Sequence, residues 1–405
     1  MKKILLNASQ KEEVRLAVIE DNKLIDLDID FPSRNIKSNI YKGTISRVEP
    51  SLEAAFVNFG RTRHGFLPFK EISPEIFSHT NKSSRDCLES GKEIIIQVDK
   101  EERGNKGAAL TTYLSLAGKY LVLLPKNPST GGISRRIEGE DRIKAKKLME
   151  SLEIPEGMSV ILRTSSLEAS NESVKWDIEY LIQIYESVLE TSVQQTAPFL
   201  IYQESSMMAR MIRDYCDETI DEVYIDDKKF FDNFISAKKL FMPHHEIKTE
   251  HHSDLTPIFS AHKIERQVQT VYKRNINLPS GGNIVIDSTE ALVSIDVNSA
   301  RSTKGSDIED TAQNTNIEAA VEILTQLKLR DIGGLVVIDF IDMMSINSQK
   351  NVMRKVAEYA KKDKAKIAFA RISKFGLMEL SRQKLKSSII QNNYETCPTC
   401  DGTGQ

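Results

Sequence analysis

Two mainly apolar stretches that each run into an aspartate constrain the fold of this chain more than any other feature. Residues 291–295 precede Asp296, and residues 334–338 precede Asp339. The segment 310–330 between them has the apolar spacing of a helix. A strand–helix–strand unit makes its two strands parallel, so their carboxyl ends lie at one edge of the sheet. The sequence therefore predicts that Asp296 and Asp339 meet at the edge of an α/β sheet.

These two carboxylates would repel each other unless a cation lay between them, which makes the edge a candidate metal site. Asn298 shares a face of its strand with Asp296, because side chains alternate with a period of two. Oxygen ligands without a nearby His or Cys favour Mg²⁺ or Mn²⁺ over zinc, and magnesium held in this way is typical of phosphate chemistry. The alternative is that both aspartates are solvent-exposed strand ends. Because the two strands that flank one helix both end in an aspartate, we favour a metal site over two solvent-exposed strand ends.

Length and composition set broad limits. A chain of 405 residues is expected to form two to four domains. Its net charge of −3 neither requires nor excludes a nucleic-acid partner, because such binding depends on local basic patches. The first residues hold too few apolar side chains for a signal peptide, and no run approaches the roughly 18 apolar residues of a membrane helix. Four cysteines argue against a disulfide framework, so we expect a cytoplasmic protein.

The first hundred residues predict β-structure. Residues 1–34 alternate apolar and polar side chains around a turn at 21–23. Short strands broken by glycines follow from Ile40 to about Leu110 and fit a small closed barrel of the OB type. Such a barrel could stack bases on Phe56, Phe59 and Phe66, and could contact phosphates through Arg47, Arg61, Arg63 and Lys106. The alternative for each phenylalanine is a place in the barrel core.

A mixed segment follows from Ala108 to about Ile201, with an amphipathic helix predicted over 175–195. In it, Arg163 and Thr164 come directly after the apolar stretch 160–162 and precede two serines. Hydroxyls, backbone N–H groups and a guanidinium at a strand end are suited to binding a phosphate. The alternative is an arginine that faces solvent.

The chain ends in a Cys-x-x-Cys motif, Cys397 and Cys400. Structural zinc needs four ligands, and the other two cysteines, Cys87 and Cys216, are isolated. Half a site suggests a zinc shared between two copies of the chain. The alternatives are a redox pair, or a site completed by residues beyond Gln405. Four of the seven histidines lie at 244, 245, 251 and 252, where exposed loop residues are expected rather than metal ligands.

Several stretches together resemble one family of proteins. They are Asn39–Gly43, Glu49–Val57, Gly131–Arg136, Ser294–Ser299, Val337–Asp342 and Cys397–Cys400. Over essentially its whole length the chain resembles the catalytic half of E-type members of the ribonuclease E/G family. The resemblance implies an α+β multidomain fold. A ribonuclease-H-like domain (1–34 and 209–271) would be split by an OB-fold RNA-binding domain (35–112) and a 5′-end sensor domain (113–208), followed by a deoxyribonuclease-I-like catalytic domain (272–393) and a zinc link (394–405).

The same resemblance implies a Mg²⁺-dependent endoribonuclease, a phosphodiester hydrolase that leaves 5′-phosphate and 3′-hydroxyl ends. It would cut single-stranded A/U-rich RNA, stimulated by a 5′-monophosphate, in mRNA decay and in rRNA and tRNA maturation. By motif position, Asp296 and Asp339 match the ligands of one Mg²⁺ per chain, and Asn298 matches a neighbour that positions the scissile phosphate. Further matched positions are Phe56, Phe66 and Lys106 for RNA binding, Arg163, Thr164, Gly118, Val122 and Arg135 around the 5′-phosphate, and Cys397 and Cys400 for one Zn²⁺ shared by two chains.

The resemblance also implies partners. A homodimer would form through the shared zinc, with a tetramer only if a further C-terminal domain is present, and with components of an RNA-degradation complex only if a scaffold region exists. The protein would be cytoplasmic or peripheral at the inner membrane. The stretch Glu49–Val57 favours the E type over the paralogous ribonuclease G type. A non-catalytic RNA-binding dimer is the alternative from another class, and the costly pairing of Asp296 with Asp339 favours the enzyme.

Overall fold

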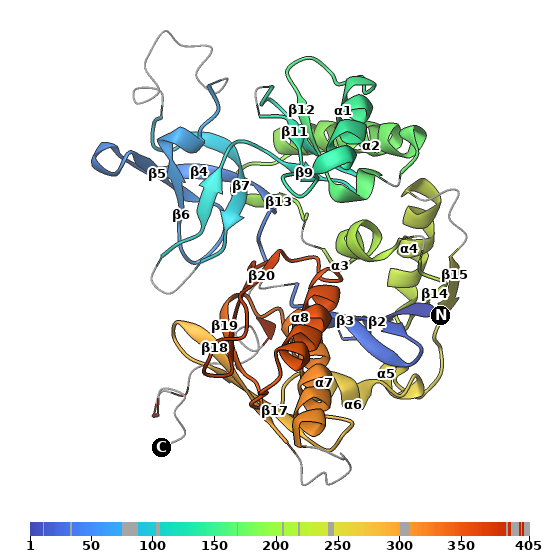
Figure 1. The fold of residues 1–405 in the computed structure, drawn as a ribbon. Helices are drawn as coiled ribbons and strands as arrows, with labels where there is room; N and C mark the ends of the chain where they lie inside the picture. The colour runs from blue at the N-terminus through green and yellow to red at the C-terminus, as the bar shows by residue number, and fades with distance from the viewer. Residues whose placement is uncertain are drawn as a thin grey trace.

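The computed structural model describes residues 1–10, 12–32, 35–74, 88–102, 106–128, 130–167, 169–204, 206–217, 219–241, 247–299, 308–385, 388–389, 397 and 399–400. Within these ranges the strands form four separate sheets (Figure 1), and the buried apolar residues form five clusters against them. The fold is therefore a mixed α+β arrangement of several units, as the length of the chain predicts. No helix among the described residues is long and apolar enough to cross a membrane.

The first sheet joins two distant parts of the chain. It has the order β15 (Lys248–His251), β14 (Glu222–Ile225), β1 (Lys2–Asn7), β2 (Val14–Glu20), β3 (Lys23–Asp30). The predicted turn between β2 and β3 is confirmed, and Asp21 and Asn22 adopt positive φ angles of 48° and 65° there. The helices in this part are α3 (Met207–Arg210), a π-helix (Met211–Tyr215), α4 (Lys228–Phe241), α5 (Ile258–Ala261) and α6 (Glu265–Thr270).

The second sheet closes on itself. Its strands are β4 (Ile40–Glu49), β5 (Ala54–Asn58), β6 (Gly65–Pro68), β7 (Glu93–Lys100) and β8 (Ala109–Thr111), with short 3-10 helices at Pro50–Leu52 and Phe69–Glu71. The barrel closes because β4 pairs with both β5 and β7. The small barrel predicted from the sequence is confirmed. β13 (Phe199–Tyr202) pairs with β4 as well, although the sequence analysis assigned its residues to the following unit.

The third sheet has the order β11 (Gly132–Ile133), β12 (Ser159–Leu162), β10 (Leu121–Leu124), β9 (Leu116–Ala117). Helices α1 (Gly139–Glu150) and α2 (Asn171–Gln194) accompany it, and a 3-10 helix (Thr164–Leu167) follows β12. The predicted amphipathic helix is confirmed as α2. The Ser170 hydroxyl caps this helix by accepting from the Ser173 N–H at 3.1 Å. Its buried residues recur at helical spacing, at Val174, Ile178, Leu181, Tyr185 and Val188.

The fourth sheet contains the predicted strand–helix–strand unit. Its order is β16 (Asn275–Asn277), β17 (Asn283–Ser288), β18 (Leu292–Asn298), β19 (Gly334–Asp339), β21 (Leu377–Arg382), β20 (Ile367–Phe369). Strands β18 and β19 are parallel, as predicted, and α7 (Ile308–Leu329) connects them. Helix α7 and helix α8 (Ile346–Ala360) share one apolar core with this sheet.

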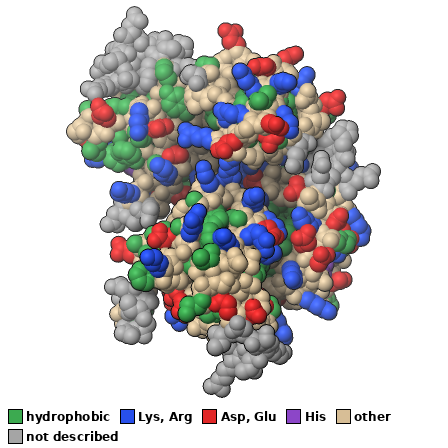
Figure 2. Space-filling view, viewed as in Figure 1, with side chains coloured by type: hydrophobic (Ala, Val, Ile, Leu, Met, Phe, Trp, Pro, Cys, Tyr) green, Lys and Arg blue, Asp and Glu red, His purple; other side chains and the backbone are tan. Residues whose placement is uncertain are grey.

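The lobe around the fourth sheet contacts the units around the third and the first sheet through polar side chains. Arg136, after β11 of the third sheet, donates to the Gln383 side chain, which follows β21, at 3.0 Å. Lys364, after α8, donates at 3.0 Å to the main-chain carbonyl of Asp214, in the π-helix that belongs to the first-sheet unit. On the face drawn in Figure 2, Lys and Arg side chains gather across the middle of the molecule, where the upper and lower lobes meet.

Candidate active site

The pairing of β18 with β19 sets Asp296 beside Asp339. The two residues are register partners at the carboxyl ends of the parallel strands. The residues before them, Ile295 and Ile338, are buried, whereas both aspartates are exposed. The carboxylates therefore lie side by side at one edge of the sheet, facing solvent.

Asn298 holds one of these carboxylates. Its side-chain amide donates to Asp296 Oδ2 at 2.8 Å and lies 3.3 Å from the side-chain oxygen of Asn283 on β17. This arrangement follows from the alternation of side chains along β18. Because the amide is shared between two acceptors on neighbouring strands, the Asp296 carboxylate is held in one orientation before any substrate arrives.

The second carboxylate is electrostatically strained. Partial burial raises the pKa of Asp339, and the charges of Asp296 and Asp342 raise it further. Asp342 lies close by, because a Cβ placed on Gly376 would sit 3.2 Å from Asp342 Oδ1 and 3.9 Å from Asp339 Oδ1. Asp342 lies within one of the stretches that resemble the family, but it was not among the predicted site residues. Its signal was a second aspartate three residues after the first.

The donor set at this edge fits a hard cation. It offers carboxylate and amide oxygens, and a cation would relieve the repulsion between Asp296 and Asp339. Among the described residues no group of three or more His, Cys, Asp or Glu side chains could hold a metal ion. Mg²⁺ is commonly bound by only one or two carboxylates together with waters and substrate phosphates, so two aspartates are enough for that ion and too few for structural zinc.

The barrel presents an aromatic pair on its outer surface. Phe56 on β5 and Phe66 on β6 are register partners, with ring centroids 5.9 Å apart in an edge-to-face arrangement. The guanidinium of Arg47 lies 5.0 Å from the centre of the Phe56 ring. Both rings are half-buried, and Lys106 is exposed. Two aromatic rings with an arginine above them form a surface that suits base stacking.

Phe59 does not belong to this surface. It is only 1% exposed and packs against Tyr41 with ring centroids 5.2 Å apart. The suggestion that Phe59 stacks on bases is therefore wrong, and its alternative, a place in the barrel core, holds. Arg61 is half-buried and Arg63 is exposed in the segment that leads to β6.

The predicted phosphate-binding residues gather at one edge of the third sheet. β11 and β12 are parallel, so Arg135 and Arg163 follow the ends of neighbouring strands. Thr164 is exposed at the start of the 3-10 helix after β12. Val122 lies further along β10, half-buried and paired with Ile161.

Arg163 already has protein partners. Its guanidinium donates to the main-chain carbonyl of Gly118 and forms an ion pair with Asp214 at 2.7 Å. Asp214 also pairs with Arg213 at 3.0 Å. Burial alone would raise the pKa of Asp214, but the two arginines outweigh it and lower that pKa. Asp214 therefore fixes the direction in which Arg163 points.

Gly118 has a structural explanation of its own. A Cβ at this position would lie 2.4 Å from a carboxylate oxygen of Asp177 on α2. That carboxylate accepts the N–H groups of Lys119, Tyr120 and Leu121. The glycine thus makes room for a buried carboxylate that fixes the turn before β10. This packing accounts for the glycine without a ligand.

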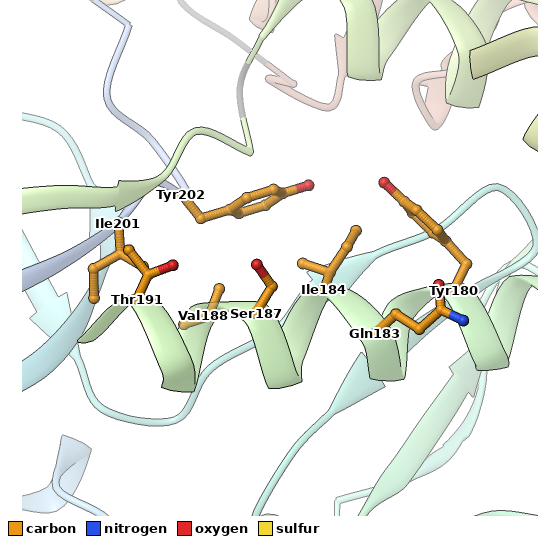
Figure 3. A pocket seen from close by; sticks show the side chains of 8 residues that line it. All are labelled: Tyr180, Gln183, Ile184, Ser187, Val188, Thr191, Ile201 and Tyr202. Atoms are coloured by element: carbon orange, nitrogen blue, oxygen red, sulfur yellow. The ribbon is translucent and has the colours of Figure 1, made fainter. Parts of the chain in front are cut away.

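Glu204 is the last member of a series of paired ionisable side chains that runs from Arg163 through Asp214 and Arg213. Arg213 pairs with its carboxylate at 2.8 Å, and the Ala117 N–H donates to it at 3.3 Å. The side chain is buried, and burial raises the pKa of Glu204 to about 7, against the opposing effect of Arg213. A cavity of about 240 Å³ lies nearby between α2 and β13. Figure 3 shows the hydroxyls of Tyr180 and Tyr202 in this cavity pointing toward each other.

The Cys-x-x-Cys motif is only partly described. Cys397 is exposed and Cys400 is half-buried. The main-chain N–H groups of Thr399 and Cys400 lower the pKa of Cys397, which favours the thiolate form that binds metals. Cys216 is buried, and burial raises the pKa of its thiol to about 12, so it is unsuited to join them. Cys87 lies outside the described residues.

Of the four clustered histidines, the structure describes His251 and His252, and His251 is not the exposed loop residue that the sequence suggested. His251 is the last residue of β15, half-buried, with its ring 5.6 Å from that of Phe231. The His252 ring nitrogen Nε2 lies 2.7 Å from the Thr256 carbonyl oxygen. His244 and His245 lie outside the described residues.

With this geometry in place, the chain was compared with known proteins. Residues 115–385 match the model of the ribonuclease E/G family, and residues 35–112 match that of the S1 RNA binding domain. The chain belongs to the ribonuclease E/G family. The S1 match coincides with the range predicted for the OB-fold domain, 35–112.

Individual proteins of this family are also similar to the chain. Ribonuclease E of Haemophilus influenzae is 51% identical over 411 residues, covering 100% of this chain and 44% of the relative. Ribonuclease E of Escherichia coli is 50% identical over 413 residues, covering 100% of this chain and 39% of the relative. Ribonuclease G of Escherichia coli is 32% identical over 411 residues, covering 99% and 83%. The chain is thus more similar to these ribonuclease E proteins than to this ribonuclease G, and spans about two fifths of the former.

The Glu204 environment predicts a pH-dependent stability. An acid whose pKa is higher in the folded than in the unfolded state binds more protons when folded, so stability falls as pH rises between the two values. Here the window runs from 4.5 to about 7. In urea unfolding at pH 5 and pH 8, the free energy of unfolding of wild type, relative to Glu204→Gln, should fall by up to about 3 kcal/mol, since one pKa unit corresponds to about 1.4 kcal/mol. An equal difference at both pH values would contradict this.

Proposed function

We propose that this protein is a Mg²⁺-dependent endoribonuclease that cuts single-stranded, A/U-rich RNA. The observation that carries the proposal is the pairing of Asp296 with Asp339 at the carboxyl edge of β18 and β19, in a chain of the ribonuclease E/G family. A parallel-strand edge is where α/β sheets place ligands. The S1 match and the Phe56–Phe66 pair support RNA as the substrate.

Each residue at the edge has a separate task in this proposal. Asp296 and Asp339 would hold Mg²⁺, which when bound neutralises phosphate charge and lowers the pKa of an attacking water. Asn298 orients the Asp296 carboxylate through its 2.8 Å hydrogen bond and positions the scissile phosphate. The products would carry 5′-phosphate and 3′-hydroxyl ends, because water rather than the ribose 2′-oxygen attacks.

The RNA would also be held away from the cut. Phe56 and Phe66 would stack on bases, while Arg47 and Lys106 contact phosphates. Arg163, Thr164 and Arg135 would bind a 5′-monophosphate, with Gly118 and Val122 beside them, and so stimulate cutting of monophosphorylated RNA. Asp214 supports this reading, because it orients the Arg163 guanidinium and leaves other N–H groups of that fork for a phosphate.

The finer architecture and the assembly belong to the same proposal. The units would be a split ribonuclease-H-like domain, an inserted OB fold and 5′-end sensor, a deoxyribonuclease-I-like domain and a zinc link. Cys397 and Cys400 of two chains would share one Zn²⁺ in a homodimer, which the lowered pKa of Cys397 supports. The enzyme would act in mRNA decay and in rRNA and tRNA maturation, in the cytoplasm or at the inner membrane.

A non-catalytic RNA-binding protein is the alternative from another class. The barrel alone would suffice for that role. Such a protein would gain nothing from placing Asp339 where partial burial and the charges of Asp296 and Asp342 raise its pKa, so the paired carboxylates favour the enzyme.

The first prediction concerns the carboxylates. Asp296→Asn or Asp339→Asn should slow cutting of a labelled single-stranded RNA by roughly 100-fold or more, because each change removes charge at the reacting centre. RNA binding, measured by filter retention, should persist. Asp287→Asn, which changes a half-buried aspartate near the other end of β17 that pairs with Arg274, is the matched control and should cut normally. Cyclic 2′,3′-phosphate products, or full activity in either active-site variant, would contradict the mechanism.

The second prediction concerns the 5′ end. Arg163→Ala should slow cutting of 5′-monophosphorylated RNA by roughly 10–100-fold, as loss of charge-assisted hydrogen bonds allows, and should barely affect 5′-hydroxylated RNA. Arg142→Ala is the matched control, since it removes an exposed arginine of α1 in the same unit. It should retain the preference for a 5′-monophosphate. Equal slowing of both substrates by Arg163→Ala would assign the arginine to the fold or to general RNA binding.

The third prediction concerns assembly. Elemental analysis of the purified protein should find about half a zinc per chain, because each chain supplies two of four ligands. Cys397→Ser should lose the zinc and the dimer together in light scattering, whereas Cys87→Ser should keep both. One zinc per chain, or a Cys397→Ser protein that stays dimeric with its zinc, would count against a shared site.

A further inference from the structure

An exposed aromatic side chain lies beside the paired aspartates. Phe375 is 83% exposed, in the turn that joins β20 to β21. Its neighbours along the hairpin behave differently, since Phe369 and Ile372 pack against the apolar core of the fourth sheet. A large ring left in water forgoes the stabilisation that burial would give it. The exposed ring of Phe375 therefore contributes little to the stability of the fold.

The turn is tied to the carboxylate edge by its backbone. Asp339 and Leu377 are register partners of β19 and β21, and the Phe340 N–H donates to the Gly376 carbonyl at 3.3 Å. Gly376 has a φ of +76°, and a Cβ there would lie 3.2 Å from Asp342 Oδ1. The residue after Phe375 thus touches the acidic edge, and Phe375 itself stands at its rim.

The turn is also held in one shape. Ser373 donates its N–H to the Leu377 carbonyl at 2.8 Å and accepts the Gly376 N–H at 3.2 Å through its own carbonyl. The Phe375 N–H donates to the Ser373 hydroxyl at 3.2 Å. Because the backbone of this turn is already fixed, little conformational entropy would be lost when the Phe375 ring binds a ligand.

The charges on the same turn suit a polyanion. Arg371 and Lys374 are both exposed and flank Phe375. An aromatic ring between two basic side chains is the pattern that binds single-stranded nucleic acid, with the base on the ring and the neighbouring phosphates on the cations. A protein partner or a second copy of the chain could also cover a phenylalanine, but the two cations favour a phosphate-bearing strand, and the adjoining edge is the candidate Mg²⁺ site past which that strand would run.

We propose that Phe375 stacks on the base of a nucleotide next to the scissile phosphate, with Arg371 and Lys374 binding the flanking phosphates. The inference rests on the proposed function and adds a base-binding position on the catalytic sheet, separate from the Phe56–Phe66 pair of the barrel. It makes Phe375 a positioning residue, which fixes the strand so that one phosphodiester lies over Asp296 and Asp339.

Fluorescence tests the stacking directly, without any cutting. The chain has one tryptophan, Trp176, so Trp176→Phe gives a silent background. In that background, Phe375→Trp should be quenched when single-stranded RNA is added in buffer without Mg²⁺. Leu255→Trp, at a fully exposed position elsewhere, is the matched control and should show no such quenching. Absence of quenching at 375, with RNA bound, would overturn the proposal.

Abasic nucleotides locate the stacked base. An RNA with one abasic site next to the cleaved bond should bind wild type about tenfold more weakly than intact RNA, by the usual strength of base–aromatic stacking. Phe375→Ala should bind both RNAs equally weakly, while Phe375→Tyr should behave as wild type. If Phe375→Ala keeps wild-type binding and cutting while Asp339→Asn is inactive, this inference fails and the proposed function stands. If wild type neither binds nor cuts RNA, both fail.

Discussion

The parallel pairing of β18 with β19 is the constraint on which the site depends. The crossover through α7 makes the two strands parallel and brings their carboxyl ends together. Buried Ile295 and Ile338 anchor the strands in the core, so the next residue of each must face solvent. The fold therefore imposes a repulsion between Asp296 and Asp339 that a bound cation would relieve. The strain in Asp339 is thus a property of the backbone pairing and not of a flexible loop.

Polar contacts between the lobes link the other surfaces to this edge. Arg163, beside the predicted 5′-phosphate site, pairs with Asp214, whose main-chain carbonyl accepts from Lys364 of the lobe that carries the aspartates. Arg136 reaches Gln383 of the same lobe. The Arg136–Gln383 and Lys364–Asp214 hydrogen bonds are exposed to solvent, so they orient the lobes without making them one rigid body. An RNA bound at one surface would therefore be presented to the other in a defined direction.

The sequence predicted most of what depends on local periodicity and chain direction. The barrel strands, the amphipathic helix α2 and the parallel strands β18 and β19 all follow from apolar spacing. Phe59 could have been separated from Phe56 by the same rule, because residues three apart on a strand face opposite sides. The burial of Phe59 therefore corrects a prediction that the alternation of side chains along the strand already argued against.

Other features depend on contacts between distant segments and could not be predicted in this way. The pairing of β13 with β4 joins residues from two predicted units. The ion pair of Arg163 with Asp214 crosses between two lobes, and the place of Phe375 beside Asp339 depends on the register of β21 against β19. The spacing of apolar residues along the chain does not determine such contacts and registers between distant segments. The functional roles of all the candidate site residues, Asn298, Lys106 and Thr164 among them, remain predictions.

Binding of a divalent cation tests the central claim, that Asp296 and Asp339 act together as one site. Titration of the purified protein with Mn²⁺, followed by electron paramagnetic resonance, counts the bound ions without any need for RNA. We predict one Mn²⁺ per chain, displaced by Mg²⁺, and at least tenfold weaker binding in both Asp296→Asn and Asp339→Asn. Unchanged affinity and stoichiometry in the two variants would contradict the account, because the paired carboxylates would then not be the site of the metal.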